Sequence, residues 1–316
     1  MRSLFFTSFC ILICFSSQLF GQVATGKMYR IDRYESIYLP LGKISFADKL
    51  VSYRVGSPPP IQKYRDSLQC LHEPNYKNYR VGDFTSLGCG GTLTVEFTDN
   101  GFMNLKGYDL YIFEVGPSRE PALIEISQNG IDWIYAGKIS GGKSSIDLSK
   151  AGIDSETVFY FLRVTDQESV CKSKSAGADI DAIGAINSVI KLSINADVLF
   201  DVAAYELKEN AAQTLDSMVS TIQKIDKATI LIEGHTDSDG DDTYNMELSK
   251  NRCNSVAEKL QDLLGADALY QYEIHPFGET KPRVPNNSQE NKQTNRRVEV
   301  RVMPPQDYYN SLPDED

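Results

Sequence analysis

Several features that mark particular classes of protein are scarce or missing in this sequence. Its 316 residues include 3 histidines, and no Cys-x-x-Cys pair or Cys/His cluster suggests a zinc site. No segment is rich in lysine and arginine, and the formal net charge is −11. Because nucleic-acid binding depends on basic side chains that neutralise phosphates, this balance argues against a nucleic-acid partner and equally against adhesion to an anionic membrane surface.

Apolar runs long enough to cross a bilayer are missing as well. The apolar core of the N-terminal segment, residues 4–15, is shorter than the about 20 residues that a transmembrane helix needs. It follows an arginine and precedes small and polar residues, which is the pattern of a cleavable secretory signal peptide over residues 1–22. Lipid attachment at Cys14 is the alternative, although Ile13 stands where lipoproteins carry a small residue. We therefore expect an exported protein.

Motifs of the common hydrolases are also missing. The sequence has no Gly-x-Ser-x-Gly elbow, no His-Glu-x-x-His and no Cys/His pair with supporting context. A glycosidase with two catalytic carboxylates stays open as an alternative, because acidic residues are abundant and a sequence does not show their distances in space. We predict a protein that is not an enzyme and has no cofactor, no catalytic residue and no metal.

The second half of the chain alternates between strand and helix patterns. Apolar residues recur at spacings of three or four from Leu207 to Ile225, which predicts a helix, and a second helix begins near Thr243. Strands are expected at residues 194–200, 228–232, 270–277 and 297–303. The order βαβαββ predicts an α/β two-layer sandwich over residues 191–304. An acidic tail without fixed structure, residues 305–316, follows it.

An ordered set of polar residues lies along these elements. Gly-His-Thr-Asp at residues 234–237 ends the second strand, and the next helix carries Asn245, Leu248, Ser249 and, 15 positions after Asp237, Arg252. Residues 277–287 and Asn-Arg-Arg-Val-Glu-Val at 295–300 follow in order. This series resembles the OmpA C-terminal-like peptidoglycan-binding family, which includes the peptidoglycan-associated lipoprotein and the flagellar stator protein MotB. The acidic loop after Asp237 does not fit a calcium-binding EF-hand, and Asp242 is the expected N-cap of the helix.

The resemblance implies non-covalent binding of peptidoglycan through the diaminopimelate of its stem peptide. Arg252 would fork onto the diaminopimelate carboxylate, and Asp237 would accept from its ammonium group. The remaining groove residues would be Thr236, Asn245, Leu248 and Ser249, with Phe200 and Asp201 on the wall. Taken singly, each of these residues also has a structural explanation. The resemblance further implies an envelope protein in the periplasm, associated with the outer membrane.

Short strand patterns separated by turn residues fill the first half of the chain. They lie at residues 92–97, 109–115, 122–127 and 158–164 and predict an all-β sandwich of jelly-roll type over residues 23–190. Stretches such as Leu-Gly-Cys-Gly-Gly from residue 87 and Gly-Ala-Asp-Ile-Asp from residue 177 resemble a β-sandwich domain of secreted and cell-surface bacterial proteins. Such sandwiches host many functions, so a glycan or an envelope protein is a candidate partner of this half.

Two alternatives for the sandwich remain open at this point. A secreted glycan-binding or hydrolytic activity could reside there, with the second domain as a tether. Calcium is another candidate ligand, because carboxylates supply the oxygen atoms that it needs, but aspartates at strand ends also cap turns. The carboxylates concerned are those of Asp99, Asp109, Glu114, Asp179 and Asp181. Trp133 is expected in the core, since large aromatic side chains are usually well buried.

Cysteines give one further expectation for an exported chain. Cys89 and Cys171 each lie beside one of the sandwich motifs, and we predict that they form a disulfide. Cys70 is then free or the alternative partner. Cys253, which stands where the family usually has alanine, is expected to be a buried thiol.

Overall fold

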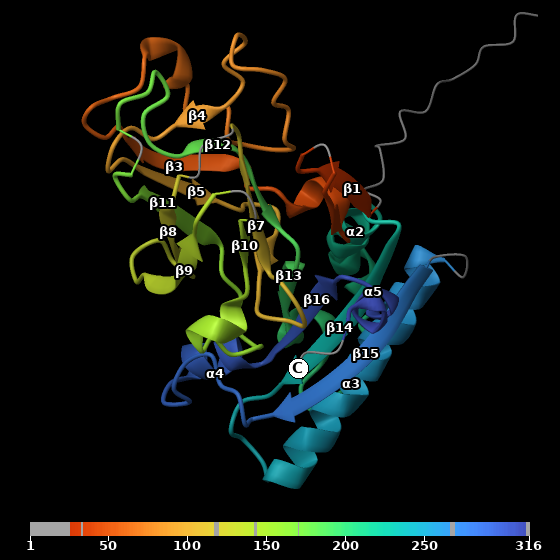
Figure 1. Ribbon diagram of the computed structural model, residues 1–316. Helices are drawn as coiled ribbons and strands as arrows, with labels where there is room; N and C mark the ends of the chain where they lie inside the picture. The colour runs from red at the N-terminus through yellow and green to blue at the C-terminus, as the bar shows by residue number, and fades with distance from the viewer. Residues whose placement is uncertain are drawn as a thin grey trace, which may run out of the picture.

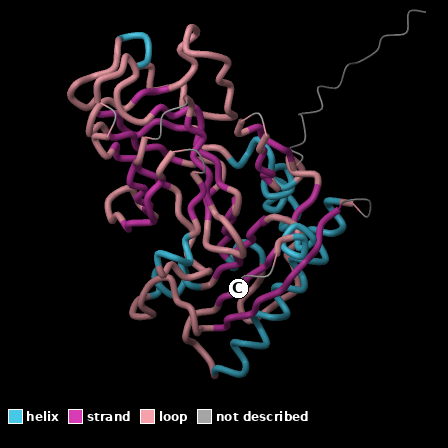
Figure 2. Tube along the Cα trace, viewed as in Figure 1, coloured by secondary structure: helices cyan, strands magenta, loops and turns pink. Residues whose placement is uncertain are grey.

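Two antiparallel sheets make up most of the first half of the chain, and a mixed sheet covered by helices makes up the second (Figures 1 and 2). The computed structural model describes residues 26–32, 34–116, 120–141, 144–169, 171–265 and 269–313. None of the helices described there is both long and apolar enough to cross a membrane. The predicted signal peptide and Cys14 lie outside the described residues.

The sheets of the first half have the strand orders β10-β7-β12-β4 and β3-β5-β11-β8-β9. Their bounds are β3 (Lys49–Arg54), β4 (Thr85–Ser86), β5 (Thr92–Glu96), β7 (Leu110–Glu114), β8 (Ala122–Ser127), β9 (Ile134–Ile139), β10 (Ser145–Ile146), β11 (Phe161–Asp166) and β12 (Asp179–Ala185). A hairpin of β1 (Lys27–Arg30) and β2 (Ser36–Leu39) precedes them. Short 3-10 helices lie in the loops at Gly42–Ser45, Gln62–Tyr64 and Leu148–Ala151.

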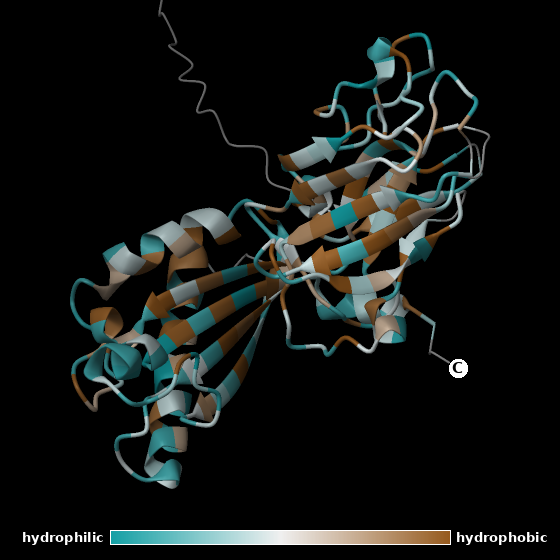
Figure 3. Cartoon of the chain, turned by 90° about the vertical axis from the view of Figure 1, so that its left-hand side faces the viewer, coloured by the Kyte–Doolittle hydropathy of each residue, from teal (hydrophilic) through white to brown (hydrophobic). Residues whose placement is uncertain are grey.

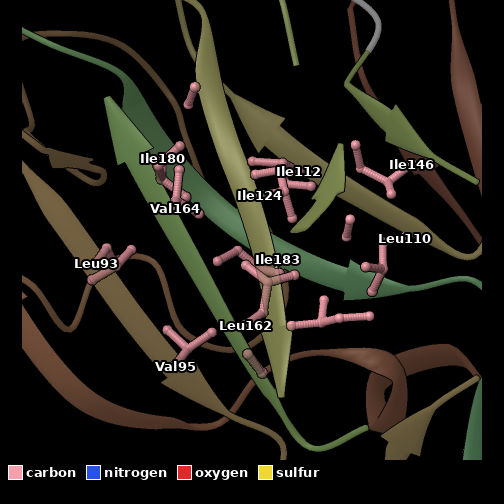
Figure 4. Close-up of a cluster of buried hydrophobic side chains, with 14 of the residues drawn as sticks. Leu93, Val95, Leu110, Ile112, Ile124, Ile146, Leu162, Val164, Ile180 and Ile183 are labelled. Atoms are coloured by element: carbon pink, nitrogen blue, oxygen red, sulfur yellow. The ribbon is translucent and has the colours of Figure 1, made fainter. Parts of the chain in front are cut away.

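Branched aliphatic side chains from both sheets fill the space between them (Figure 4). Alternate residues of each strand point inward, so β5 contributes Leu93 and Val95 while β7 contributes Leu110 and Ile112, all fully buried. Burying each such side chain contributes roughly 1.5–3 kcal/mol to folding. This cluster is therefore the main source of stability of the sandwich.

The predicted strands of the sandwich are present, and the bounds of three of them differ from the prediction. Strand β11 begins at Phe161 rather than at residue 158, because Phe159 forms only an isolated bridge to Phe102. The expectation for Trp133 is wrong, since this side chain is only partly buried. The guanidinium of Arg163 lies 3.8 Å from the centre of the Trp133 ring. This cation–π contact covers the indole at the surface of the sandwich.

The predicted disulfide between Cys89 and Cys171 is present and links positions 82 residues apart. It ties the loop before β5 to the segment before β12. Cys70 and Cys253 are free and fully buried, as expected for thiols that contribute only to packing.

The second half is built on a five-stranded sheet with the order β15-β14-β16-β13-β6. Its strands are β6 (Gly101–Phe102), β13 (Ser188–Asn195), β14 (Lys227–His235), β15 (Leu269–Gly278) and β16 (Arg297–Met303), and only β14 and β15 pair in parallel. The helices are α1 (Ala196–Leu199), α2 (Ala211–Ile222), α3 (Asp242–Leu264), α4 (Gln289–Asn295) and α5 (Gln306–Ser311).

Helices α2 and α3 cover one face of this sheet and produce its apolar core. Alternate residues of β16, Val298 and Val300, face the helices and pack with Leu215 of α2 and Val256 of α3. The intervening residues of β16 are charged and face the other way, which gives the alternation of hydrophobic and hydrophilic colour along the strands in Figure 3. The predicted two-layer arrangement of helices on a sheet is therefore observed.

Three local predictions for this half are wrong. The first strand ends at Asn195, and residues 196–199 form a helical turn because the Asn195 side chain accepts a hydrogen bond from the backbone N–H of Asp197. Asp241, and not Asp242, caps α3, since its carboxylate accepts from the backbone N–H of Tyr244. Residues 306–311 of the tail form the helix α5, which the apolar contacts of Tyr308 hold against the sandwich.

Strand β13 crosses the boundary that we predicted between residues 190 and 191. Its first residues pair with β6 of the first half, and residues 190–195 pair with β16. Ser188, Val189 and Ile190 are buried. The two halves are thus joined by a continuous strand and not by an exposed linker.

Candidate functional site

Asp237 lies where the long strand β14 has just ended, beside the neighbouring segment that leads into β16. Its Oδ2 accepts a hydrogen bond from Arg296 Nη1 at 2.6 Å, and its Oδ1 accepts from the backbone N–H of Asp239 at 3.1 Å. The residue is 6% exposed. A carboxylate held from both sides in this way keeps a fixed direction, which is what a ligand-binding acceptor needs.

Arg296 is a member of this site that our sequence interpretation missed. Its Nε and Nη2 donate to the two carboxylate oxygens of Asp197 at 2.9 and 2.8 Å, while Nη1 reaches Asp237. The hydrogen bonds to Asp197 make the largest contribution to a raised pKa of Arg296, and the bond to Asp237 adds to it. The contact with Arg296 in turn lowers the pKa of Asp197. The motif Asn-Arg-Arg-Val-Glu-Val was visible in the sequence, but nothing in it indicates which arginine turns toward Asp237.

Arg252 lies on α3, close to the two carboxylates but without an ion pair to either. Its Nε donates to the backbone carbonyl of Ala204 at 2.9 Å, and its guanidinium lies 5.1 Å from the centre of the Phe200 ring. Burial lowers the pKa of Arg252, and the charges of Asp197 and Asp237 oppose that effect. No carboxylate among the described residues lies within ion-pair distance of this side chain, which is 4% exposed.

Asn245 and Ser249 hold the loops around the site in place. Asn245 Nδ2 donates to Glu279 Oε2 at 2.6 Å and lies 3.3 Å from the carbonyl oxygen of Asp237. Ser249 Oγ accepts from the backbone N–H of Gly278 at 3.0 Å. Both side chains are fully or almost fully buried. Their hydrogen bonds are with the protein itself, and they fix the ends of β14 and β15 against α3.

The other predicted groove residues differ in their surroundings. Phe200 is buried beneath Arg252, and Leu248 is 9% exposed on α3. Thr236 is buried, with its backbone N–H bonded to Gly278. Asp201 is exposed and pairs loosely with Lys208 at 3.4 Å. The structure thus brings Asp237, Asn245, Arg252 and Phe200 together and leaves Asp201 at the rim.

The close packing of β14 on α3 explains the glycine of the Gly-His-Thr-Asp motif. A Cβ atom on Gly234 would lie 2.6 Å from the Ser249 carbonyl oxygen and 2.7 Å from Cys253 Sγ. Any side chain there would push α3 away from the strand. Gly234 therefore permits the close spacing of β14 and α3.

A second buried polar cluster, formed by Glu233, His235 and Glu299, lies on the opposite face of the sheet. Its possible metal-ligand atoms all lie within 4.8 Å of one another. It lines a cavity of about 380 Å³ between the sheet and residues 154–160 of the sandwich. Both ring nitrogens of His235 are buried without a hydrogen-bond partner, and burial lowers its pKa to about 3.

The charges around this cluster argue against a metal ion. Glu299 already pairs with three cations at 2.6 Å each, those of Lys191, Arg283 and Arg297, and Glu233 pairs with Arg301 at 2.8 Å. Burial favours protonation of Glu299, but these contacts outweigh it and lower its pKa to about 2. A divalent cation placed among four basic side chains would meet strong repulsion. The cluster is an ion-pair network that lies between the sheet and the sandwich.

Two of the carboxylates considered for calcium, those of Asp109 and Asp181, bind the protein itself. Asp109 accepts from the backbone N–H groups of Leu105 and Leu148 at 2.9 and 2.7 Å and from Asn187 Nδ2 at 2.6 Å. Asp181 accepts from the backbone N–H of Asn75 at 3.1 Å. Hydrogen bonds of this kind fix turns and loops against the strands.

The second half of the chain is similar to known proteins. Residues 199–296 match the model of the OmpA family, so this part of the chain is an OmpA family domain. The chain is 31% identical over 141 residues to outer membrane porin F of Pseudomonas aeruginosa, which covers 44% of this chain and 39% of the relative. It is also 31% identical over 147 residues to the probable lipoprotein YiaD of Escherichia coli, covering 46% and 65% respectively.

A solved structure also resembles the chain. The cell wall anchor of the T6SS from Pseudomonas aeruginosa is 28% identical, and the match covers 38% of this chain and 85% of that one with a TM-score of 0.33. The chain spans less than two thirds of the length of the curated relatives named above.

Proposed function

We propose that this chain is an exported envelope protein whose OmpA family domain binds peptidoglycan non-covalently through the diaminopimelate of the stem peptide. We infer a binding protein and not an enzyme. The names of the relatives, an outer membrane porin and a probable lipoprotein, support an envelope location. Peptidoglycan itself is what the family resemblance implies for the domain at residues 199–296.

The observation that carries this proposal is the unpaired guanidinium of Arg252 beside the positioned carboxylate of Asp237. The side-chain end of diaminopimelate has a carboxylate and an ammonium group on one carbon. The carboxylate complements Arg252, which can donate two parallel hydrogen bonds to it. The ammonium complements Asp237, because a carboxylate oxygen bonded to Arg296 still has a free lone pair.

Exposed apolar residues lie next to these charges and would line the approach to them. Val202 is 96% exposed, and Tyr205 and Tyr244 are each 44% exposed. Ser255 of α3 donates to the Tyr205 carbonyl at 2.7 Å, so the loop after Phe200 is held against the helix. A stem peptide would find a partly apolar wall beside the two charged groups.

Calorimetric titration with two stem peptides tests the proposal. The diaminopimelate peptide should bind the full-length chain, whereas the lysine peptide lacks the carboxylate and leaves Arg252 buried and unpaired. Such a loss costs about 2–5 kcal/mol, or at least about 25-fold in affinity. Arg252→Ala should lose as much while remaining folded by circular dichroism, and Arg252→Lys should bind poorly because an ammonium cannot form the fork.

Arg54→Ala is the matched control, because Arg54 is an exposed arginine of β3 in the sandwich. It should bind the diaminopimelate peptide like the unchanged chain. Equal affinity for the two peptides, or full binding by a folded Arg252→Ala variant, would refute the proposal.

A further inference from the structure

A cavity of about 950 Å³ lies on the sandwich, far from the site at Arg252 in the sequence and on other elements. Strand β1 and residues 73–77 form two of its sides, and the C-terminal end of β7 with Asp181 of β12 forms the third. Its volume is that of a pocket for a small ligand. Both apolar and hydrogen-bonding groups line it.

Two carboxylates in this cavity have no cationic partner in the part of the chain that the structure describes. Glu114 Oε2 accepts from Ser144 Oγ at 2.6 Å, and Asp181 accepts from the backbone N–H groups of Asn75 and Tyr76 at 3.1 and 3.2 Å. No ion pair to either carboxylate exists among the described residues. Burial raises the pKa of Glu114 to about 7 and that of Asp181 to about 6. A carboxylate accepts about four hydrogen bonds, so both can accept more from a ligand.

A third carboxylate and an aromatic ring complete the lining. Glu73 accepts from Lys27 Nζ and from the Tyr29 hydroxyl, each at 2.7 Å, which fixes it at the wall formed by β1. The partly buried ring of Tyr76 packs edge-on against Tyr79 and Phe84, each at 5.8 Å between ring centres. A ring braced in this way offers a rigid apolar surface at low entropic cost.

We propose that this cavity binds a saccharide, with hydroxyl groups donating to Glu114 and Asp181 and an apolar sugar face resting on Tyr76. A sugar combines many donors with an apolar face, which matches carboxylates placed beside an aromatic ring. A metal ion fits less well, because the carboxylates of this cavity do not form a group of three possible ligand residues: among the described residues only Glu233, His235 and Glu299 do so. The proposal is independent of stem-peptide binding at Arg252.

Titration of the full-length chain with chitotriose, cellotriose and maltotriose, followed by NMR or calorimetry, tests this site. At least one of the three should bind, and Tyr76→Ala should weaken that binding about tenfold or more. The isosteric Glu114→Gln removes the charged acceptor and should weaken binding by a similar factor even if Tyr76→Ala disturbs the fold. Tyr135→Ala is the matched control, because Tyr135 is a 56% exposed tyrosine of β9 outside the cavity.

Several outcomes would overturn the proposal. These are no binding of any of the three sugars at millimolar concentration, binding that neither variant changes, and equal loss in Tyr135→Ala. Binding of calcium in place of a sugar, abolished by Glu114→Gln, would also overturn it. Arg252→Ala should keep sugar binding while it loses the stem peptide, so the two proposals fail separately.

Discussion

At the scale of single residues, the site depends on an arginine that joins two carboxylates. Arg296 binds Asp197 with two nitrogens and Asp237 with the third. Arg252 has no ion pair among the described residues, while Arg296 pairs with both Asp197 and Asp237. The tertiary structure thus adds to the motif a difference between the two arginines: Arg296 binds two carboxylates, and Arg252 donates to the backbone carbonyl of Ala204.

We predict that Arg296→Gln lowers stability at neutral pH and that this loss becomes smaller in acid. The pKa of Asp197 is lowered in the folded chain, so its contribution is present above about pH 4, the ordinary pKa of aspartate, and is lost as pH falls through the folded value. Because the Asp197 and Arg296 side chains are 36% and 25% exposed, solvent screening limits the expected loss to about 1 kcal/mol.

Urea unfolding at pH 7 and at pH 2.5 measures this effect. The variant should be less stable than the unchanged chain at pH 7, and the difference should shrink at pH 2.5. Arg54→Gln, at an exposed site on β3, should show no difference at either pH. A constant difference across the pH range would mean that Arg296 acts through packing.

At the scale of elements, helix α5 connects the end of the chain to both halves. Tyr308 packs against the apolar cluster around Tyr29 and Phe113, and the Tyr309 hydroxyl donates to Asn187 Oδ1 at 3.1 Å. Asp307 pairs with Lys227 at the start of β14. The acidic composition of the tail suggested disorder, but these two tyrosines supply enough contacts to hold one helical turn and a half.

We predict that Tyr308→Ala destabilises the chain by about 1–3 kcal/mol, less than for a fully buried aromatic residue because this ring is only partly buried. Chemical denaturation measures the change. Asn310→Ala, at an exposed position of the same helix, is the control and should have little effect. Equal stability of Tyr308→Ala and the unchanged chain would show that α5 does not dock in solution.

At the scale of the whole molecule, the halves share a strand and an interface. Strand β13 pairs with β6 and with β16, and on the face opposite the helices Lys281 pairs with Glu156 at 2.5 Å while Arg301 Nη1 donates to the Glu156 carbonyl at 3.2 Å. The sandwich therefore covers charged residues that a free two-layer domain would expose to water. Residues 191–304 remain our proposal for the peptidoglycan-binding region. A fragment with these bounds, however, lacks Ile190, which belongs to the apolar core between the sheet and its helices.

We predict that a fragment of residues 186–313 is more stable than a fragment of residues 191–304. The longer one keeps the whole of β13, including the buried Ile190, together with α5. Thermal unfolding compares them, and co-sedimentation with purified sacculi tests binding. The longer fragment should bind like the full-length chain. If only the full-length chain sedimented, the sandwich would have to be part of the peptidoglycan site.

Local patterns by themselves determined much of this protein. The spacing of apolar residues gave α2 and the alternation Arg-Val-Glu-Val-Arg-Val gave β16 with its correct bounds, because the periods of helix and strand are local properties. The pairing of Cys89 with Cys171 was correct as well. The family motif placed Asp237 and Arg252 near one another, since a strand exit and the next helix are close along the chain.

Only the tertiary structure decided the contacts between distant segments. Arg296 reaches Asp237 across 59 positions, Tyr309 reaches Asn187 across 122, and Arg163 rather than the core covers Trp133. Such contacts depend on which strands become neighbours in a sheet and on which side chains their faces leave uncovered. A charged or aromatic residue has several acceptable partners in a sequence, and packing selects one of them.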